Sequence, residues 1–258
     1  MNLRATFPAR QLLSAALSGL LLAGAATVSA QTATDTVTLK TTPPQRKTGV
    51  LVTGVVGGKV MIREGSGEIG YNMAQIESVQ KAAPTEFTRG MGFVEAGKME
   101  EALPLLKAVA DKYKGLPTTW AQDATAALGN LYLSLGKISE AETAFADLKN
   151  AYGGANSLAA SVGQARLAAA KKKYADARSI AEPIVRDALT KKNITRAESQ
   201  LYGQAYFVLG QVAEGENKLP EAMENYCRTV AIFYQERSVV AEAQKRIDGL
   251  RQKGVATP

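Results

Sequence analysis

Histidine is absent from the 258-residue chain, which also contains a single cysteine and a single tryptophan. Without histidine, the chain cannot form a Ser-His-Asp or Cys-His nucleophile system or a histidine-ligated zinc site. One cysteine permits neither an internal disulfide nor a metal site built from several thiolates. These absences exclude most hydrolase and metalloenzyme mechanisms. We therefore expect a protein that is not an enzyme, with no catalytic residues, no metal site and no cofactor.

Acidic residues are fewer than basic ones: 24 Asp and Glu stand against 31 Lys and Arg, which gives a net charge of +7. This excess is modest, whereas dedicated nucleic-acid modules usually concentrate their charge on one face. We therefore expect protein partners and no nucleic acid.

The first thirty residues have the features of an export signal. Arg4 and Arg10 form a positive region without acidic residues, residues 12–28 are apolar, and small side chains suit cleavage between Ala30 and Gln31. The apolar stretch is short for a membrane anchor, which needs ~20 residues. The sequence therefore predicts an exported, periplasmic protein that keeps no membrane span after cleavage.

The composition changes near residue 84. Residues 31–83 are rich in Val, Thr, Ile and Gly and predict a small β module with strands at 37–39, 49–56, 59–62, 68–73 and 76–79. Gly57 and Gly58 predict a type I′ hairpin turn, because glycine adopts positive φ at little cost. A flat sheet of such short strands buries little apolar surface. We therefore expect a closed or half-closed β-barrel, in a pattern that resembles the SH3-like and Sm-like barrels.

Residues 65–70 match the G-x-G-x-x-G spacing of dinucleotide-binding turns. That mechanism needs a helix directly after the glycines, so that its N-terminus receives the pyrophosphate. A strand-like run containing Tyr71 and Met73 follows instead. The motif is therefore interpreted as a hairpin turn.

Residues 84–258 are dense in good helix formers and contain an internal repeat. In the clearest unit, Gly129 precedes Tyr132, and Ala141 precedes Phe145 by four residues. The same spacing recurs in an earlier unit with Gly90, Phe93, Ala102 and Leu106. A degenerate third unit has Ala165, Ala168, Ala177 and Ala181, and a later unit has Leu209, Gly210, Ala222 and Tyr226. The spacing resembles that of the tetratricopeptide repeat (TPR) family, with anchor alanines 39, 36 and 45 residues apart.

The resemblance implies a mostly α protein, a right-handed α-solenoid of helical hairpins. Small residues at the anchor positions allow antiparallel helices to approach closely, and Gly97, Gly136 and Asn217 lie where a hairpin must reverse. Because each hairpin leaves one apolar face open, the hairpins must stack, and the amphipathic residues 236–253 predict a helix that caps the array.

Two exported families look similar: the periplasmic TPR protein of the Tol–Pal envelope system and the TPR-type outer-membrane assembly lipoprotein. The first typically has a coiled coil where this chain has its β module, and the second carries a lipidated cysteine that is missing here. What carries over is the general property that TPR arrays bind protein segments.

The family's geometry implies that the first helix of each hairpin lines an inner surface. The candidate protein-binding groove comprises Met91, Glu95, Asn130, Leu133, Arg166, Phe207 and Gln211. Among these, Asn130, Arg166 and Gln211 form a polar strip, whose alternative interpretation is a solvated helix face. The carboxylate clamp of chaperone-binding TPRs is not reproduced, because Ala159 and Gly163 occupy its two basic positions in the third unit.

Cys227 lies beside Tyr226, and its pattern favours a small buried side chain over an intermolecular disulfide. Taken together, the sequence predicts an exported, non-enzymatic scaffold that binds a peptide or partner protein of the cell envelope. The alternative is a self-assembling, homo-oligomeric subunit in which the β module does the recognition.

Overall fold

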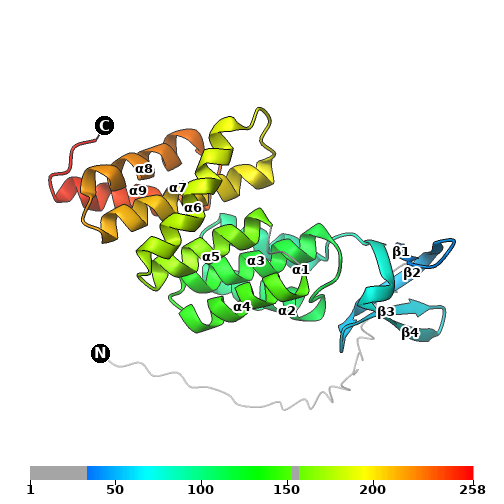
Figure 1. Cartoon of the computed structure of the whole chain (residues 1–258). Coiled ribbons are helices and arrows are strands. Elements are labelled where there is room, and N and C mark those ends of the chain that lie inside the picture. Colours follow the sequence, from blue (N-terminus) through cyan, green and yellow to red (C-terminus); the bar gives the residue numbers. More distant parts are fainter. Residues whose placement is uncertain (1–33, 153–156, 258) are drawn as a thin grey trace, which may run out of the picture. The chain divides into compact units, whose positions relative to one another are not determined.

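The computed structural model describes residues 34–152 and 157–257 (Figure 1). The predicted export signal at 1–30 lies outside these residues. The strands are β1 (Asp35–Leu39), β2 (Gln45–Val56), β3 (Lys59–Glu64), β4 (Gly67–Asn72) and β5 (Ile76–Gln80), with the 3-10 turn η1 (Met73–Gln75) before β5. The helices are α1 (Thr85–Glu95), α2 (Met99–Lys112), α3 (Thr119–Ser134), α4 (Ile138–Ala151), α5 (Leu158–Ala170), α6 (Tyr174–Thr190), α7 (Arg196–Gly215), α8 (Leu219–Ile232) and α9 (Arg237–Gln252).

The strands form one antiparallel sheet with the order β4-β3-β2-β1-β5. The β2–β3 turn has positive φ at both Gly57 and Gly58, as a type I′ hairpin requires. Strand β2 begins earlier than the sequence indicates, because its first residues pair with β1 in a register that places Leu39 opposite Gln45.

Of the expected closed or half-closed barrel, the closed form is wrong: β4 and β5 are the two edges of an open sheet. The physical reason is that the helices complete the core of the sheet. Val37, Val52 and Ile62 of the sheet share a buried cluster with Tyr113, at the end of α2, and Trp120, near the start of α3. A sheet that is covered in this way buries its apolar face without closing on itself.

Polar contacts fix the sheet to the helices at the same junction. The Lys81 ammonium lies 3.0 Å from the Asp35 carboxylate, and both side chains are buried. Asp35 also accepts the backbone N–H of Val52, and the Trp120 indole N–H donates to the carbonyl oxygen of Lys81. Because a buried ion pair is stable only when its other hydrogen-bonding groups are satisfied, this network specifies one arrangement of strand and helix.

The first eight helices form four antiparallel hairpins, α1–α2, α3–α4, α5–α6 and α7–α8, and successive hairpins pack on one another (Figure 1). The described helical part is thus a solenoid. None of its helices is both long and apolar enough to cross a bilayer.

Each hairpin reverses through one residue in the left-handed region. These residues are Gly97, Gly136, Lys172 and Asn217, with φ of 74°, 71°, 57° and 60°. In every case the lysine that follows donates its backbone N–H to a carbonyl five residues earlier, as Lys137 does to Tyr132 at 2.8 Å. This is the hydrogen bond of a Schellman motif, which satisfies carbonyls at the end of a helix.

The glycines of the repeat make room for aromatic rings. A Cβ atom at Gly129 would lie 2.6 Å from the Phe145 ring, and one at Gly163 would lie 2.3 Å from it. A Cβ atom at Gly210 would likewise lie 2.4 Å from the Tyr226 ring, and one at Gly90 would lie 2.9 Å from the Leu106 side chain. The alanines Ala102, Ala141 and Ala222 are fully buried, and Tyr132 is 9% exposed. One ring therefore fills space left by glycines on two successive hairpins, α3–α4 and α5–α6.

Helix α9 covers the last hairpin. Its apolar side, with Val239, Ala243, Ile247 and Leu250, is buried against Phe207 and Tyr226. The same helix also contacts α1, at the opposite end of the helical array.

Replacing Gly163 by Ala should lower the free energy of unfolding by about 1–3 kcal/mol, because the added methyl group overlaps the Phe145 ring. The matched control is Gly92→Ala in α1, where a Cβ meets nothing within 4 Å. This control should gain about 0.5–1 kcal/mol from its better helix propensity. Urea unfolding measures both values, and equal gains in the two variants would contradict the packing described.

Replacing Lys172 by Gly should raise the free energy of unfolding by about 1 kcal/mol, because a residue with a side chain is strained at φ 57°. Lys173→Gly is the control, since its φ is −84° and glycine relieves nothing there. A thermal or urea unfolding series on the three proteins measures the difference. Lower stability of the Lys172 variant would show that the left-handed turn is not strained.

Candidate protein-binding groove

The seven predicted groove residues lie on the first helices of the hairpins: Met91 and Glu95 on α1, Asn130 and Leu133 on α3, Arg166 on α5, and Phe207 and Gln211 on α7. The structure places six of them along two cavities, whereas Asn130 lines neither. Leu133, Arg166, Phe207 and Gln211 line one of them, and Met91 and Glu95 line the other.

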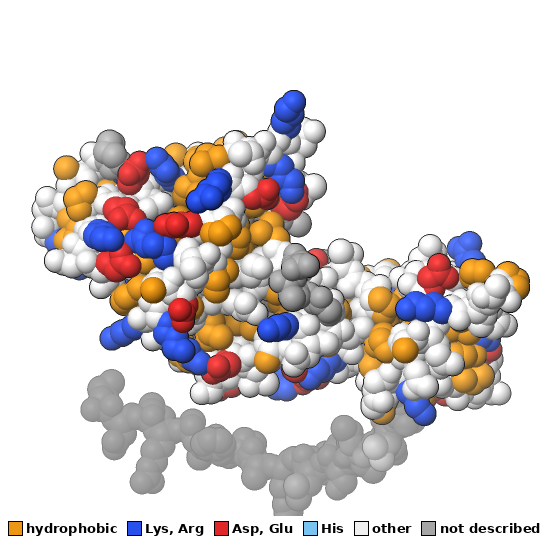
Figure 2. Space-filling view, viewed as in Figure 1, with side chains coloured by type: hydrophobic (Ala, Val, Ile, Leu, Met, Phe, Trp, Pro, Cys, Tyr) orange, Lys and Arg blue, Asp and Glu red, His pale blue; other side chains and the backbone are white. Residues whose placement is uncertain are grey.

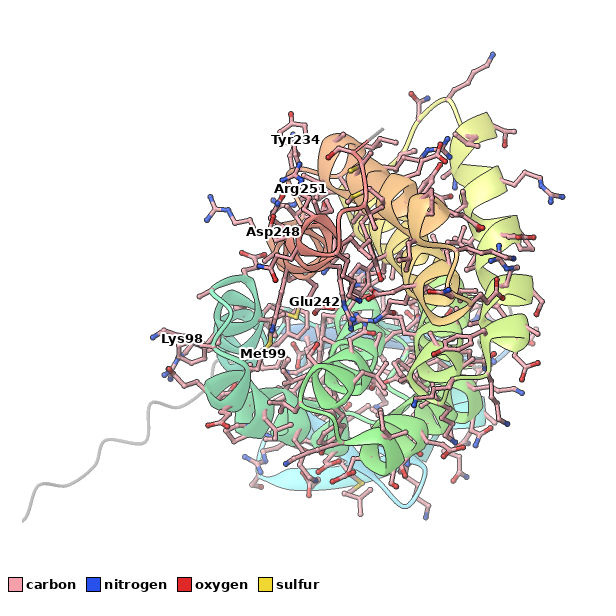
Figure 3. All side chains as sticks on the ribbon, turned by 90° about the vertical axis from the view of Figure 1, so that its left-hand side faces the viewer. Lys98, Met99, Tyr234, Glu242, Asp248 and Arg251 are labelled. Carbon is pink, nitrogen blue, oxygen red and sulfur yellow. The ribbon has the colours of Figure 1, made fainter. Side chains whose placement is uncertain are left out.

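The first cavity, called the groove cavity below, has a volume of about 670 Å³. The first helices of the second to fourth hairpins contribute one side of it, and α9 contributes the other. Its lining comprises Met99, Leu133, Ser134, Arg166, Ala170, Phe207, Gln211, Glu214, Glu242, Lys245, Arg246, Gly249 and Lys253. Figure 3 shows Glu242 on the side of α9 that faces the other helices, and Met99 at the start of α2 nearby.

Arg166 is the central polar group of the groove cavity. Its side chain is 10% exposed, and its guanidinium donates to the amide oxygen of Asn130 at 3.3 Å. A second N–H group points at the Glu242 carboxylate on α9, 3.5 Å away. Two residues of the predicted polar strip are therefore joined directly, and the third, Gln211, is half-buried in the same lining.

The apolar members of the predicted groove differ in their exposure. Phe207 is 2% exposed and packs its ring 5.5 Å from that of Tyr226, so it forms the floor of the cavity and is covered by neighbouring side chains. Leu133 is only half-buried and presents part of its side chain to the cavity.

The second cavity, of about 690 Å³, lies between α1, the start of α7, and the α8–α9 loop with the first residues of α9. Met91 and Glu95 meet Tyr234, which is 68% exposed, and Glu236, which is 8% exposed. The Glu236 Oε1 atom is buried without a hydrogen-bond partner among the described residues. Burial raises the pKa of the Glu236 carboxyl, Arg196 and Ser199 lower it in part, and Glu95 raises it further.

The contribution of α9 to both cavities was not expected from the sequence, which indicated only a cap. The signal was present in the polar residues of this helix. Glu242, Arg246, Gly249 and the C-cap residue Lys253 follow one another at steps of four, three and four, with Lys245 beside them. They define a second face, beside the apolar one that covers the last hairpin.

Other residues singled out from the sequence lie away from the groove cavity. Cys227 is half-buried, and burial raises the pKa of its thiol. Positive and negative side chains are interspersed over the described residues on the face shown in Figure 2, which bears no single large basic area.

A comparison with protein families agrees with the hairpin geometry. Residues 93–162 match the tetratricopeptide repeat family. Among curated protein sequences, none matches this chain. The solved structure of MamA (41-end) from Desulfovibrio magneticus is 19% identical, with a TM-score of 0.37, over 67% of this chain and 98% of that one. A tetratricopeptide repeat protein from Parabacteroides merdae is 15% identical, with a TM-score of 0.38, over 62% of this chain and 68% of that one.

The family match and the stacked hairpins define the helical part as a TPR-like solenoid. TPR proteins are generally scaffolds for protein interactions, because stacked repeats create extended concave binding surfaces.

Replacing Glu236 by Gln should make stability less dependent on pH. A carboxyl whose pKa is raised by folding binds more protons in the folded than in the unfolded state, so wild-type stability falls as pH rises above about 4.3. At pH 7 the variant should be more stable by on the order of 1 kcal/mol, the cost of a poorly satisfied buried charge. Below the unfolded-state pKa this difference should vanish.

Urea unfolding of wild type and Glu236→Gln across this pH range measures the effect. A difference that does not change with pH, or that favours the wild type at neutral pH, would contradict the burial of an ionised Glu236.

Proposed function

We propose that the chain is an exported, non-enzymatic scaffold that binds a segment of a cell-envelope protein in the groove cavity. The observation that supports it most directly is the position of Leu133, Arg166 and Gln211. These residues, chosen from the repeat pattern, line one cavity on the first helices of three successive hairpins. Such an arrangement suits an extended segment, whose backbone and side chains need polar groups at regular intervals.

The cellular part of the proposal is supported by the sequence. The basic, then apolar, then small-residue pattern of positions 1–30 favours export. The non-enzymatic part is supported by the absence of histidine and the single cysteine.

The test is affinity capture from envelope extract. We expect the triple variant Asn130→Ala/Arg166→Ala/Gln211→Ala to lose a partner that the wild type retains, with recovery reduced about tenfold or more. The matched control is Glu100→Ala/Lys149→Ala/Arg186→Ala, which changes three exposed residues on the second helices α2, α4 and α6. This control should retain the partner.

Identical partner profiles for all three proteins would remove the groove residues from the proposal. Because Arg166 is buried, the melting temperature of each variant is measured first, and the single variant Gln211→Ala replaces the triple variant if the latter unfolds. Light scattering on the wild type separates the scaffold from the second candidate, a self-assembling subunit that would pair through the open edge strand β4. A monomer at high concentration contradicts that second candidate.

A further inference from the structure

The charged lining of the groove cavity is unbalanced. Four cationic side chains, Arg166, Lys245, Arg246 and Lys253, stand against two carboxylates, Glu214 and Glu242. Two of the four cations, Lys245 and Arg246, lie on α9, and Lys253 directly follows this helix. The cavity therefore carries a local excess of positive charge, even though charges of both signs are interspersed elsewhere on the surface shown in Figure 2.

Both carboxylates already have partners within the protein. Glu214 accepts the phenolic O–H of Tyr226 at 2.9 Å and lies 3.4 Å from Arg246 and 3.9 Å from Lys253. Glu242 lies 3.5 Å from Arg166. The Lys245 side chain, by contrast, is exposed, and its ammonium makes no hydrogen bond or ion pair within residues 34–152 and 157–257.

Arg166 is under-coordinated for a cation that is nine-tenths buried. A guanidinium has five N–H donors, whereas the described contacts of Arg166 are one amide oxygen at 3.3 Å and one carboxylate oxygen at 3.5 Å. Both distances are longer than is usual for an N–H···O hydrogen bond. Since a buried charge is costly unless it is well paired, Arg166 gains from a closer carboxylate than the one that α9 supplies.

We propose that the groove cavity binds an acidic segment of the partner protein, and that Arg166 and Lys245 pair with its carboxylates. Glu242 occupies the place of one such carboxylate and competes with the partner for Arg166. The half-buried Leu133 offers an apolar contact beside these charges, which favours a peptide, with its mixed side chains, over a uniformly charged polymer. This inference rests on the proposed scaffold function and specifies the chemistry of its partner.

The experiment is isothermal titration of the full mature chain with the blocked peptide acetyl-Glu-Leu-Glu-Glu-amide and with its Gln-Leu-Gln-Gln counterpart. We expect the acidic peptide alone to bind. Lys245→Gln should raise its Kd at least about fivefold, and Glu242→Gln should lower its Kd by a similar factor, because Arg166 is then released. Lys192→Gln changes an exposed lysine outside the cavity and should leave the Kd unchanged.

A general loss of structure would not change the Kd in opposite directions in Lys245→Gln and Glu242→Gln. Neither side chain is buried, so both variants should fold. The proposal would be overturned if the two peptides bound equally, if the Kd were unchanged in Lys245→Gln, or if Glu242→Gln bound the acidic peptide more weakly. It would also be overturned if a single-stranded DNA oligonucleotide bound more tightly than the acidic peptide. If the wild type binds neither peptide but still captures a partner that the triple groove variant loses, the acidic partner is wrong and the scaffold function stands.

Discussion

The architecture depends on the way in which aromatic rings enter space that glycine leaves empty. The Phe145 ring lies against both Gly129 and Gly163, so a single side chain sets the distance between two helices of its own hairpin and the first helix of the next. Tyr226 has the same relation to Gly210. Because interiors are close-packed, these contacts leave little freedom in how one hairpin sits on another. The positions of Asn130, Arg166 and Gln211 along the groove follow from that spacing.

Packing between distant parts of the chain also explains why the β module is an open sheet. Its strands and turns could be predicted from residues close in sequence, since Gly57 and Gly58 determine a hairpin locally. Whether the sheet closes is decided by Tyr113 and Trp120, which lie far along the chain and cover its apolar face. No local pattern in the strands contains that information. The buried pair of Asp35 and Lys81 shows the same dependence on distant residues.

The groove was predictable to the extent that it follows from the repeat. First-helix positions such as Leu133 and Arg166 could be placed because equivalent residues recur in each unit. The third turn was missed because Lys172 has neither the small size nor the local hydrogen bonding that makes Gly or Asn recognisable there. A lysine after the left-handed residue in all four turns is the signal that identifies it. The α9 wall could not be predicted from the repeat, because α9 lies outside it.

The apolar face of α9 holds the helix in place, while its polar face supplies the charged wall of the groove cavity. Its apolar face buries Val239, Ile247 and Leu250, each of which contributes about 1.5–3 kcal/mol relative to exposure. Moving the whole helix away from the last hairpin would therefore cost several kcal/mol, more than a weak peptide contact supplies. The Glu242 side chain, which is 35% exposed, can instead rotate away from Arg166 while the helix stays in place. Competition for Arg166 is then a side-chain event, and the wall formed by Lys245 and Arg246 persists in both states.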